Sequence, residues 1–110
     1  MAIFLPLLIM PRMRLSGYMI KIANMQIKFS KFFLKQFAKA PELIVAAFDQ
    51  KMQIFVLDKY NPILNNHQLK GKYEGCRSIN INGDWRAIFE ELGNGDIYFE
   101  FIGTHSQLYK

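Results

Sequence analysis

The stretch that decides the fold is SININGDWRAIFEE, residues 78–91. Two apolar-rich segments flank Asn82–Gly83, and an Asn-Gly pair in that position is the strongest short-range signal for a β-hairpin, because both central residues of a type I′ turn take positive φ. With those two residues as the loop, the facing positions would be Ile81 with Asp84, Asn80 with Trp85, and Ile79 with Arg86. Asp84 and Arg86 then share one face of the hairpin, where a surface ion pair would contribute well under about 1 kcal/mol.

The segments before the hairpin predict a strand and two helices. MQIKFS, residues 25–30, alternates apolar and polar residues as a short strand does. Ser30 is a favourable helix cap, and the helix after it repeats apolar side chains at Phe33 and Phe37, with lysines on another face. A second helix is predicted from Pro41 to the break at DKYNP, residues 58–62.

A polar connection with two glycines then leads into the hairpin, and a last strand, DIYFEFIG at residues 96–103, follows the turn GNG. The predicted order is a strand, a helical hairpin and a three-stranded antiparallel meander. Such an order indicates an α+β domain with its helices on one face of an antiparallel sheet.

A chain of 110 residues that is 51% hydrophobic is long enough for one domain with its own core. Residues 1–24 differ in character, because their apolar run is interrupted by Pro6, is too short to span a bilayer and has no basic residues before it. We therefore expect an extension of uncertain role at 1–24, an organised domain at 25–110 and no membrane partner. Cys76 is the only cysteine, so no internal disulfide can form and a cytoplasmic location is expected.

The charge is basic overall but unevenly distributed. The chain has 14 Lys and Arg against 9 Asp and Glu. Between Lys28 and Arg77 there are nine basic and four acidic residues, whereas Ser78 to Lys110 holds two basic and five acidic residues. The first of these parts is suited to an anionic partner such as nucleic acid, and the second is not.

Two histidines lie in polar segments, NNHQLKGK and GTHSQLYK. Histidine, carboxylate, arginine and lysine side chains are the groups that metal-free RNA cleavage requires: a base for the 2′-hydroxyl, an acid for the 5′-oxygen and cations for the phosphorane. Exposed aromatic rings can hold splayed bases by stacking. No ligands at a recognised metal-site spacing are present in the sequence, so neither a metal nor another cofactor is expected.

NNHQLKGKYEGCRSININGDWRAIFEE followed by IGTHSQLYK resembles the RelE/ParE superfamily of toxins from bacterial type II toxin–antitoxin pairs, and within it the RelE and YafQ-like mRNA interferases. The resemblance covers about residues 25–110. It implies a sheet like that of small microbial ribonucleases, cleavage of mRNA in the ribosomal A site, and a cognate antitoxin that blocks the toxin in a hetero-oligomer.

The resemblance also implies roles for individual residues. His67 and His105 match proton-transferring histidines, Asp84 and Trp85 match the family's Asp-Trp pair, and Tyr109 matches a terminal aromatic near the substrate. On this basis His105 is the expected general acid, and Asp84 or His67 the base. The residues expected to hold phosphates or bases are Lys70, Lys72, Arg77, Asn80, Trp85, Arg86 and Tyr109. Asn80 departs from the pattern, because a further active-site histidine of the family falls there and an amide cannot transfer a proton.

Two alternatives remain at this level. The same fold also supports ParE-like inhibition of DNA gyrase, against which the two histidines argue, and an inactive remnant that only binds its antitoxin. Codon preference and the identity of the antitoxin do not follow from the sequence.

Overall fold

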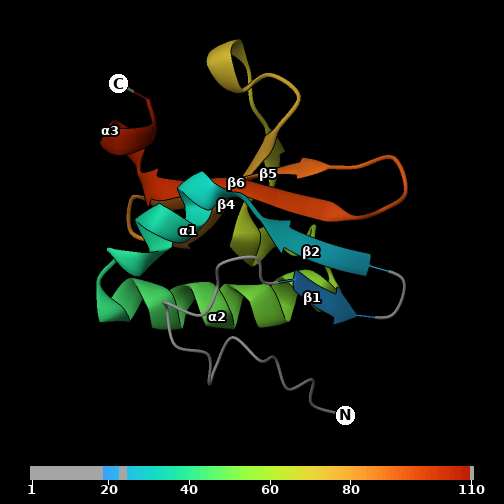
Figure 1. Cartoon of the computed structure of the whole chain (residues 1–110), viewed down its shortest axis with the longest axis horizontal. Coiled ribbons are helices and arrows are strands. Elements are labelled where there is room, and N and C mark those ends of the chain that lie inside the picture. The colour runs from blue at the N-terminus through green and yellow to red at the C-terminus, as the bar shows by residue number, and fades with distance from the viewer. Residues whose placement is uncertain (1–18, 23–24, 110) are drawn as a thin grey trace.

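The computed structural model describes residues 19–22 and 25–109 of the chain (Figure 1). Along the chain its elements are β1 (Met19–Ile22), β2 (Met25–Phe29), α1 (Lys31–Ala38), α2 (Glu42–Leu57), η3 (Pro62–Leu64), β3 (His67–Gln68), η4 (Gly71–Tyr73), β4 (Arg77–Asn82), β5 (Trp85–Glu91), β6 (Ile97–Thr104) and α3 (His105–Leu108). The predicted α+β class is confirmed, as are the strand, the two helices and the meander β4-β5-β6.

The strands form one sheet of order β1-β2-β6-β5-β4-β3. β2 runs parallel to β6, with Ile27 beside Ile97 and Phe29 beside Phe99, while the other neighbouring strands are antiparallel. The sheet is therefore mixed: its meander is antiparallel as predicted, and the parallel pairing of β2 with β6 was not predicted. A parallel neighbour requires a long crossover, and here the chain between β2 and β6 contains both long helices and the rest of the meander.

Two strands lie outside the predicted set. β1 pairs with the outer edge of β2 and belongs to residues 1–24, of which positions 1–18 and 23–24 lie outside the described part. β3 has only two residues and pairs His67 with Ser78. The proposed boundary between an extension and a domain at residue 25 therefore falls between two paired strands.

The hairpin exists, but its register differs from the one predicted. Asn82 faces Trp85 and Asn80 faces Arg86, so Ile81 is an extra residue in β4. Gly83 and Asp84 form the turn; Gly83 has φ of 56° and Asp84 does not take positive φ. Positive φ at the first central residue alone is typical of a type II′ turn, which favours glycine there. With this turn and bulge, Ile79 faces Ala87 in the main core, where the predicted pairing would have placed Arg86.

The main core lies between the sheet and the helices α1 and α2 (Figure 1). Ser30 caps α1 as predicted, because its Oγ accepts a hydrogen bond from the Phe33 backbone N–H at 3.0 Å and donates to the Glu100 carbonyl at 2.6 Å. The core is rich in phenylalanine rings whose centroids lie 5.0 to 6.4 Å apart: Phe29, Phe33, Phe37, Phe48, Phe55, Phe89 and Phe99.

The opposite face of the sheet carries a smaller cluster of buried side chains, formed by Tyr73, Ile88 and Leu108. In Figure 1, α3 and the turn η4 lie on the side of the sheet away from α2. These short segments leave part of this face accessible. Within residues 19–22 and 25–109, no helix is long and apolar enough to cross a membrane.

Candidate active site

Strand alternation separates the predicted site residues into two groups. Ile79 and Ala87 face each other within the main core, so Asn80 and its partner Arg86 point to the opposite face. His67 is the cross-strand neighbour of Ser78, which lies on the same face as Asn80. We call this side, with α3 and η4, the open face.

His105 and Asp84 come together at the end of the hairpin. Thr104 begins α3 with a capping box, in which its Oγ1 accepts from the Gln107 backbone N–H while the Gln107 side chain accepts from the Thr104 N–H. The His105 backbone N–H donates to the Asp84 carbonyl at 2.9 Å. This bond fixes α3 against the turn, so both exposed side chains lie at one end of the sheet.

Tyr109 and Tyr73 extend this group of side chains across the open face. The ring centroids of His105 and Tyr109 are 4.7 Å apart, and those of Tyr109 and Tyr73 are 5.4 Å apart at an interplanar angle of 88°. The Tyr73 hydroxyl donates to the Leu108 carbonyl at 2.6 Å, which fixes the ring beneath α3. Burial raises the pKa of Tyr109 and the neighbouring Tyr73 adds to this, while Arg86 lowers it, so the phenol remains protonated at neutral pH.

Arg86 lies close to the same group but does not pair with Asp84. Its Nη1 donates to the carbonyls of Gly83 at 2.8 Å and Trp85 at 3.0 Å. Among the described residues the guanidinium forms no ion pair, so the ion pair considered for the hairpin is absent there. The bonds hold the guanidinium at the hairpin end, and its remaining N–H donors are available for a phosphate.

Asn80, on the strand beside Arg86, has an unsatisfied polar atom. Its Oδ1 is buried and accepts no hydrogen bond within the described part of the chain. The Ser78 Oγ, two residues earlier on the same face, is also buried without a partner. Buried polar atoms without partners are uncommon in stable interiors, and a catalytic or binding role is one explanation for such an atom.

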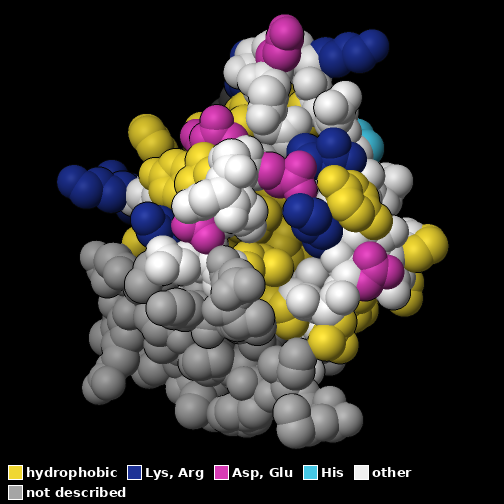
Figure 2. Space-filling model, turned by 90° about the vertical axis from the view of Figure 1, so that its right-hand side faces the viewer, with side chains coloured by type: hydrophobic (Ala, Val, Ile, Leu, Met, Phe, Trp, Pro, Cys, Tyr) yellow, Lys and Arg dark blue, Asp and Glu magenta, His cyan; other side chains and the backbone are white. Residues whose placement is uncertain are grey.

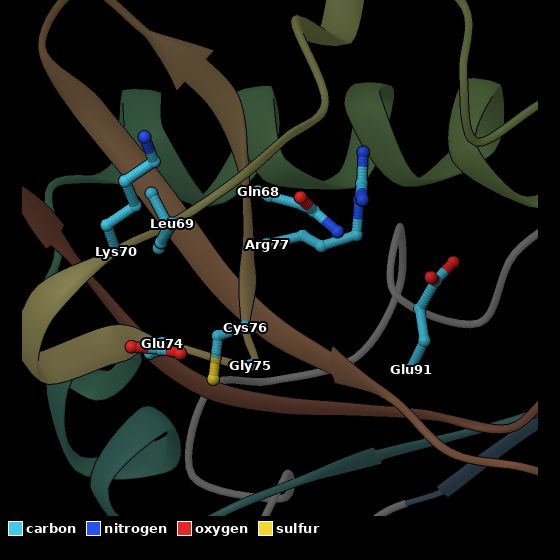
Figure 3. Close-up of a pocket in the computed structure, with 8 residues that line it drawn as sticks. All are labelled: Gln68, Leu69, Lys70, Glu74, Gly75, Cys76, Arg77 and Glu91. Carbon is cyan, nitrogen blue, oxygen red and sulfur yellow. The ribbon is translucent and has the colours of Figure 1, made fainter.

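His67 and the two predicted lysines belong to the segment around η4. The His67 ring is exposed, and its Nδ1 lies 2.7 Å from the Asn65 carbonyl oxygen, which fixes the ring. The Lys72 ammonium lies 5.1 Å from the centroid of the Tyr73 ring. Lys70 lines a hollow of about 600 Å³ beside β4 (Figure 3).

Trp85 and Arg77 lie on the other face of the sheet. Trp85 packs against the main core and borders a hollow together with Gln36 and Lys39 from α1 or the turn after it. Arg77 donates from Nε to the Asn66 Oδ1 at 2.7 Å, and its guanidinium carbon lies 5.3 Å from the Tyr60 ring centroid. Figure 3 shows the Arg77 and Cys76 side chains pointing in different directions from neighbouring positions. The predicted RNA contacts of Trp85 and Arg77 are therefore separated from the open face.

The open face also contains residues that sequence reasoning did not select. Tyr73, Phe101, Glu90 and Glu100 line a hollow of about 520 Å³ together with Lys72, Glu74 and Cys76. The alternation within β5 and β6 could have predicted that Glu90 and Phe101 face this side of the sheet. The bulge at Glu100 and the folding of η4 over the sheet are tertiary features that no local pattern predicts. On the side of the molecule in Figure 2, basic side chains alternate with acidic and hydrophobic ones rather than forming a continuous basic surface.

No group of three or more histidine, cysteine, aspartate or glutamate side chains in the described ranges is arranged to hold a metal ion. The arrangement instead offers imidazole, carboxylate, guanidinium and phenol groups, which are suited to proton transfer and to anion binding.

A family model for the YafQ bacterial toxin of type II toxin–antitoxin systems matches residues 25–110. The chain belongs to the YafQ toxin family. The matched segment begins at β2 and contains the described members of both core clusters, and β1 lies before it. No match was found among functionally curated proteins.

Solved structures of YafQ and YoeB toxins share the fold. YafQ from E. coli strain BL21(DE3) is 21% identical over 76% of this chain and 97% of its own, with a TM-score of 0.65. The toxin in the E. coli DinJ–YafQ toxin–antitoxin complex is 22% identical over 80% of this chain and 100% of its own, with a TM-score of 0.66. A chain of the YoeB–YefM complex from Staphylococcus aureus is 21% identical over 76% of this chain and 99% of its own, with a TM-score of 0.58. This YafQ-family chain thus has the type II toxin fold with an added edge strand.

Proposed function

We propose that this YafQ-family toxin is a ribosome-dependent endoribonuclease that cleaves mRNA in the A site without a catalytic metal ion. The observation that supports it best is the placement of His105, Asp84 and Arg86 at one end of the sheet, beside the ring of Tyr109. His67 lies on the same face. These are a proton donor, a carboxylate and a cation around a single accessible surface.

In the proposed reaction the ribose 2′-oxygen attacks the adjacent phosphorus while the bond from phosphorus to the 5′-oxygen breaks. Asp84 or His67 accepts the 2′-hydroxyl proton, and His105 in its imidazolium form gives a proton to the departing 5′-oxygen. The products are a 2′,3′-cyclic phosphate and a free 5′-hydroxyl. An imidazole can both accept and donate a proton, which suits both proton transfers.

Cations and aromatic rings have the remaining roles. Arg86 stabilises the negative charge of the phosphorane, because its guanidinium is already held at the hairpin end by two carbonyls. Lys72 and Lys70 approach the phosphates that flank the cut, and Asn80 orients a phosphate or a base. Tyr109, which is 36% exposed, stacks on a base.

A cognate antitoxin is the expected protein partner. The DinJ–YafQ and YoeB–YefM structures are complexes of toxins with their antitoxins. By analogy, we expect this chain to form a toxin–antitoxin hetero-oligomer that blocks the open face. A substrate on the ribosome places the active toxin in the cytoplasm.

Induced expression in a bacterial host tests the proposal. We expect translation to stop and translated mRNAs to be cut within codons, with no DNA damage response. Transcript ends mapped by sequencing, with a His105→Gln variant as the control, give the result. Growth arrest with gyrase-linked DNA breaks and intact mRNA would instead support the ParE-like alternative.

A further inference from the structure

The hollow of about 520 Å³ on the open face is connected to the proposed catalytic groups by a row of ring contacts that begins at Tyr73 in its wall. Its wall includes Phe101 and Tyr73, whose ring centroids are 5.4 Å apart at an interplanar angle of 60°. Tyr73 in turn contacts Tyr109, and Tyr109 contacts His105. A nucleotide adjacent to the cleaved phosphate can therefore reach this hollow, and an aromatic wall is suited to holding the flat face of a base.

The polar side chains that line the hollow include the carboxylates of Glu90 and Glu100. Glu100 is the extra residue of the bulge in β6, and its Oε2 accepts a hydrogen bond from the Cys76 Sγ at 3.7 Å. Within the described residues, Cys76 is the only hydrogen-bond partner of this carboxylate. The pKa of the Cys76 thiol is raised mainly by burial, then by Glu100, and Glu90 adds to this rise. Carboxylates repel phosphates, so the groups they would bind in RNA are N–H donors of bases.

Only one of the four bases presents two adjacent donors to a carboxylate. Guanine carries N1–H and N2–H side by side, which match the two oxygens of a carboxylate. Adenine and cytosine place a ring acceptor beside their amino group, and uracil places its single N3–H between two carbonyls. An acceptor that faces a carboxylate is left unpaired, which weakens binding of the other three bases. The Lys72 ammonium lines the same hollow and can donate to the guanine O6.

We propose that this hollow is a guanine-binding subsite, in which Glu100 reads the N1–H and N2–H donors while Tyr73 and Phe101 contact the base. This inference deepens the proposed function, because it assigns a base preference to the RNA that the toxin cuts. Glu100 is a specificity-determining residue in this scheme and takes no part in proton transfer.

Binding can be measured without cleavage. We would titrate the full chain with 3′-GMP, 3′-IMP, 3′-AMP and 3′-CMP and follow the backbone amide NMR signals of Cys76, Glu100 and Phe101. The expected result is binding of 3′-GMP about tenfold tighter than of 3′-IMP, which lacks only the N2 amino group and hence one charge-assisted hydrogen bond. Equal shifts with all four nucleotides would overturn the inference.

The Glu100→Gln variant tests the role of Glu100 in recognising guanine. The amide nitrogen of the new side chain is itself a donor and would face the guanine donors. We expect it to bind 3′-GMP at least tenfold more weakly and to lose the preference over 3′-IMP. Glu91→Gln is the matched control: Glu91 follows Glu90 in β5 but contacts Lys59 and Tyr60 instead, so its preference should be unchanged. An unchanged preference in Glu100→Gln would overturn the assignment of Glu100.

Cut sites mapped in cells separate this inference from the proposed function. If the wild-type chain binds guanine selectively but leaves mRNA intact, the proposed nuclease activity fails and the subsite remains. If mRNA is cut but the wild-type chain shows no guanine preference in the titration, the subsite fails and the nuclease remains. Support for both requires wild-type cuts enriched beside guanine and loss of that enrichment in Glu100→Gln.

Discussion

His105 and Asp84 have side chains that contribute little to the fold, because both are exposed and their mutual bond is between backbone atoms. Their contribution is the position of their side-chain functional groups. The capping box at Thr104 begins α3 directly beside the hairpin turn, and this places the His105 imidazole and the Asp84 carboxylate at the same end of the sheet. Chemistry and stability are therefore separable at these two residues.

The variants His105→Gln and Asp84→Ala should each change the free energy of unfolding by no more than about 1 kcal/mol. Loss of a positioned acid or base should lower the cleavage rate by about a hundredfold to ten-thousandfold. Thermal unfolding and cleavage on programmed ribosomes measure the two effects, with Ser106→Ala as an exposed neighbouring control. A wild-type rate in His105→Gln would refute its role as the acid.

Cys76 should be an unreactive thiol. Burial, the Glu100 carboxylate and the more distant Glu90 raise its pKa from 9.0 to about 11. At pH 8 the thiolate fraction should thus be about a hundredfold below that of an ordinary thiol, and alkylation should be slower in proportion, rising about tenfold per pH unit up to pH 11. Iodoacetamide labelling followed by mass spectrometry measures this rate. The Glu100→Gln variant should react faster, because the negative charge that raises the pKa of the Cys76 thiol is removed.

The hairpin β4–β5 contributes side chains both to the main core and to the open face of the sheet. The bulge at Ile81 in β4, and the bulge at Glu100 in β6 where β5 pairs with it, let these strands bury apolar residues against the helices and turn polar ones to the open face. Trp85 lies on the helix side and therefore links the hairpin to α1 more directly than to any substrate.

Trp85→Ala should destabilise the protein by about 2 to 3 kcal/mol, less than the 3 to 5 kcal/mol typical of a fully buried aromatic, because this ring is only partly buried. Trp85→Phe should restore most of the loss. Urea unfolding of the two variants measures the difference. If Trp85→Ala unfolded like the wild type but no longer cut mRNA, the ring would instead contact the substrate.

At the scale of the whole molecule, the two core clusters define the folding unit. Every member whose side chain is described lies between Met25 and Leu108, inside the segment that the family model matches. β1 adds backbone pairing at the edge of β2, outside that segment.

A chain that lacks residues 1–24 should therefore still fold cooperatively, with a lower midpoint because one edge of β2 loses its partner. Circular dichroism during thermal unfolding, compared with the full chain, measures this. A truncated chain without a cooperative transition would show that the extension belongs to the core and that the boundary at residue 25 is wrong.

The sequence by itself determined the fold class, the element order and the α1 cap, because these depend on local periodicity and on residues such as Ser30 and Gly83 that act within a few positions. It also placed His105, Asp84, Arg86 and Tyr109 together through the family resemblance. Their roles stay predictions.

Tertiary structure decided the rest. The parallel pairing of β2 with β6 joins residues about seventy positions apart, as in the bond from the Gln26 N–H to Asp96, and no local pattern specifies it. With the turn at Gly83 and Asp84 and the bulge at Ile81, Ile79 faces Ala87 in the main core instead of Arg86. Strand alternation then separated Arg77 and Trp85 from the open face, since a shift of one residue reverses the face of every side chain that follows. The bulge in β6 and the folding of η4 over the sheet brought Glu100 and Tyr73 to the open face.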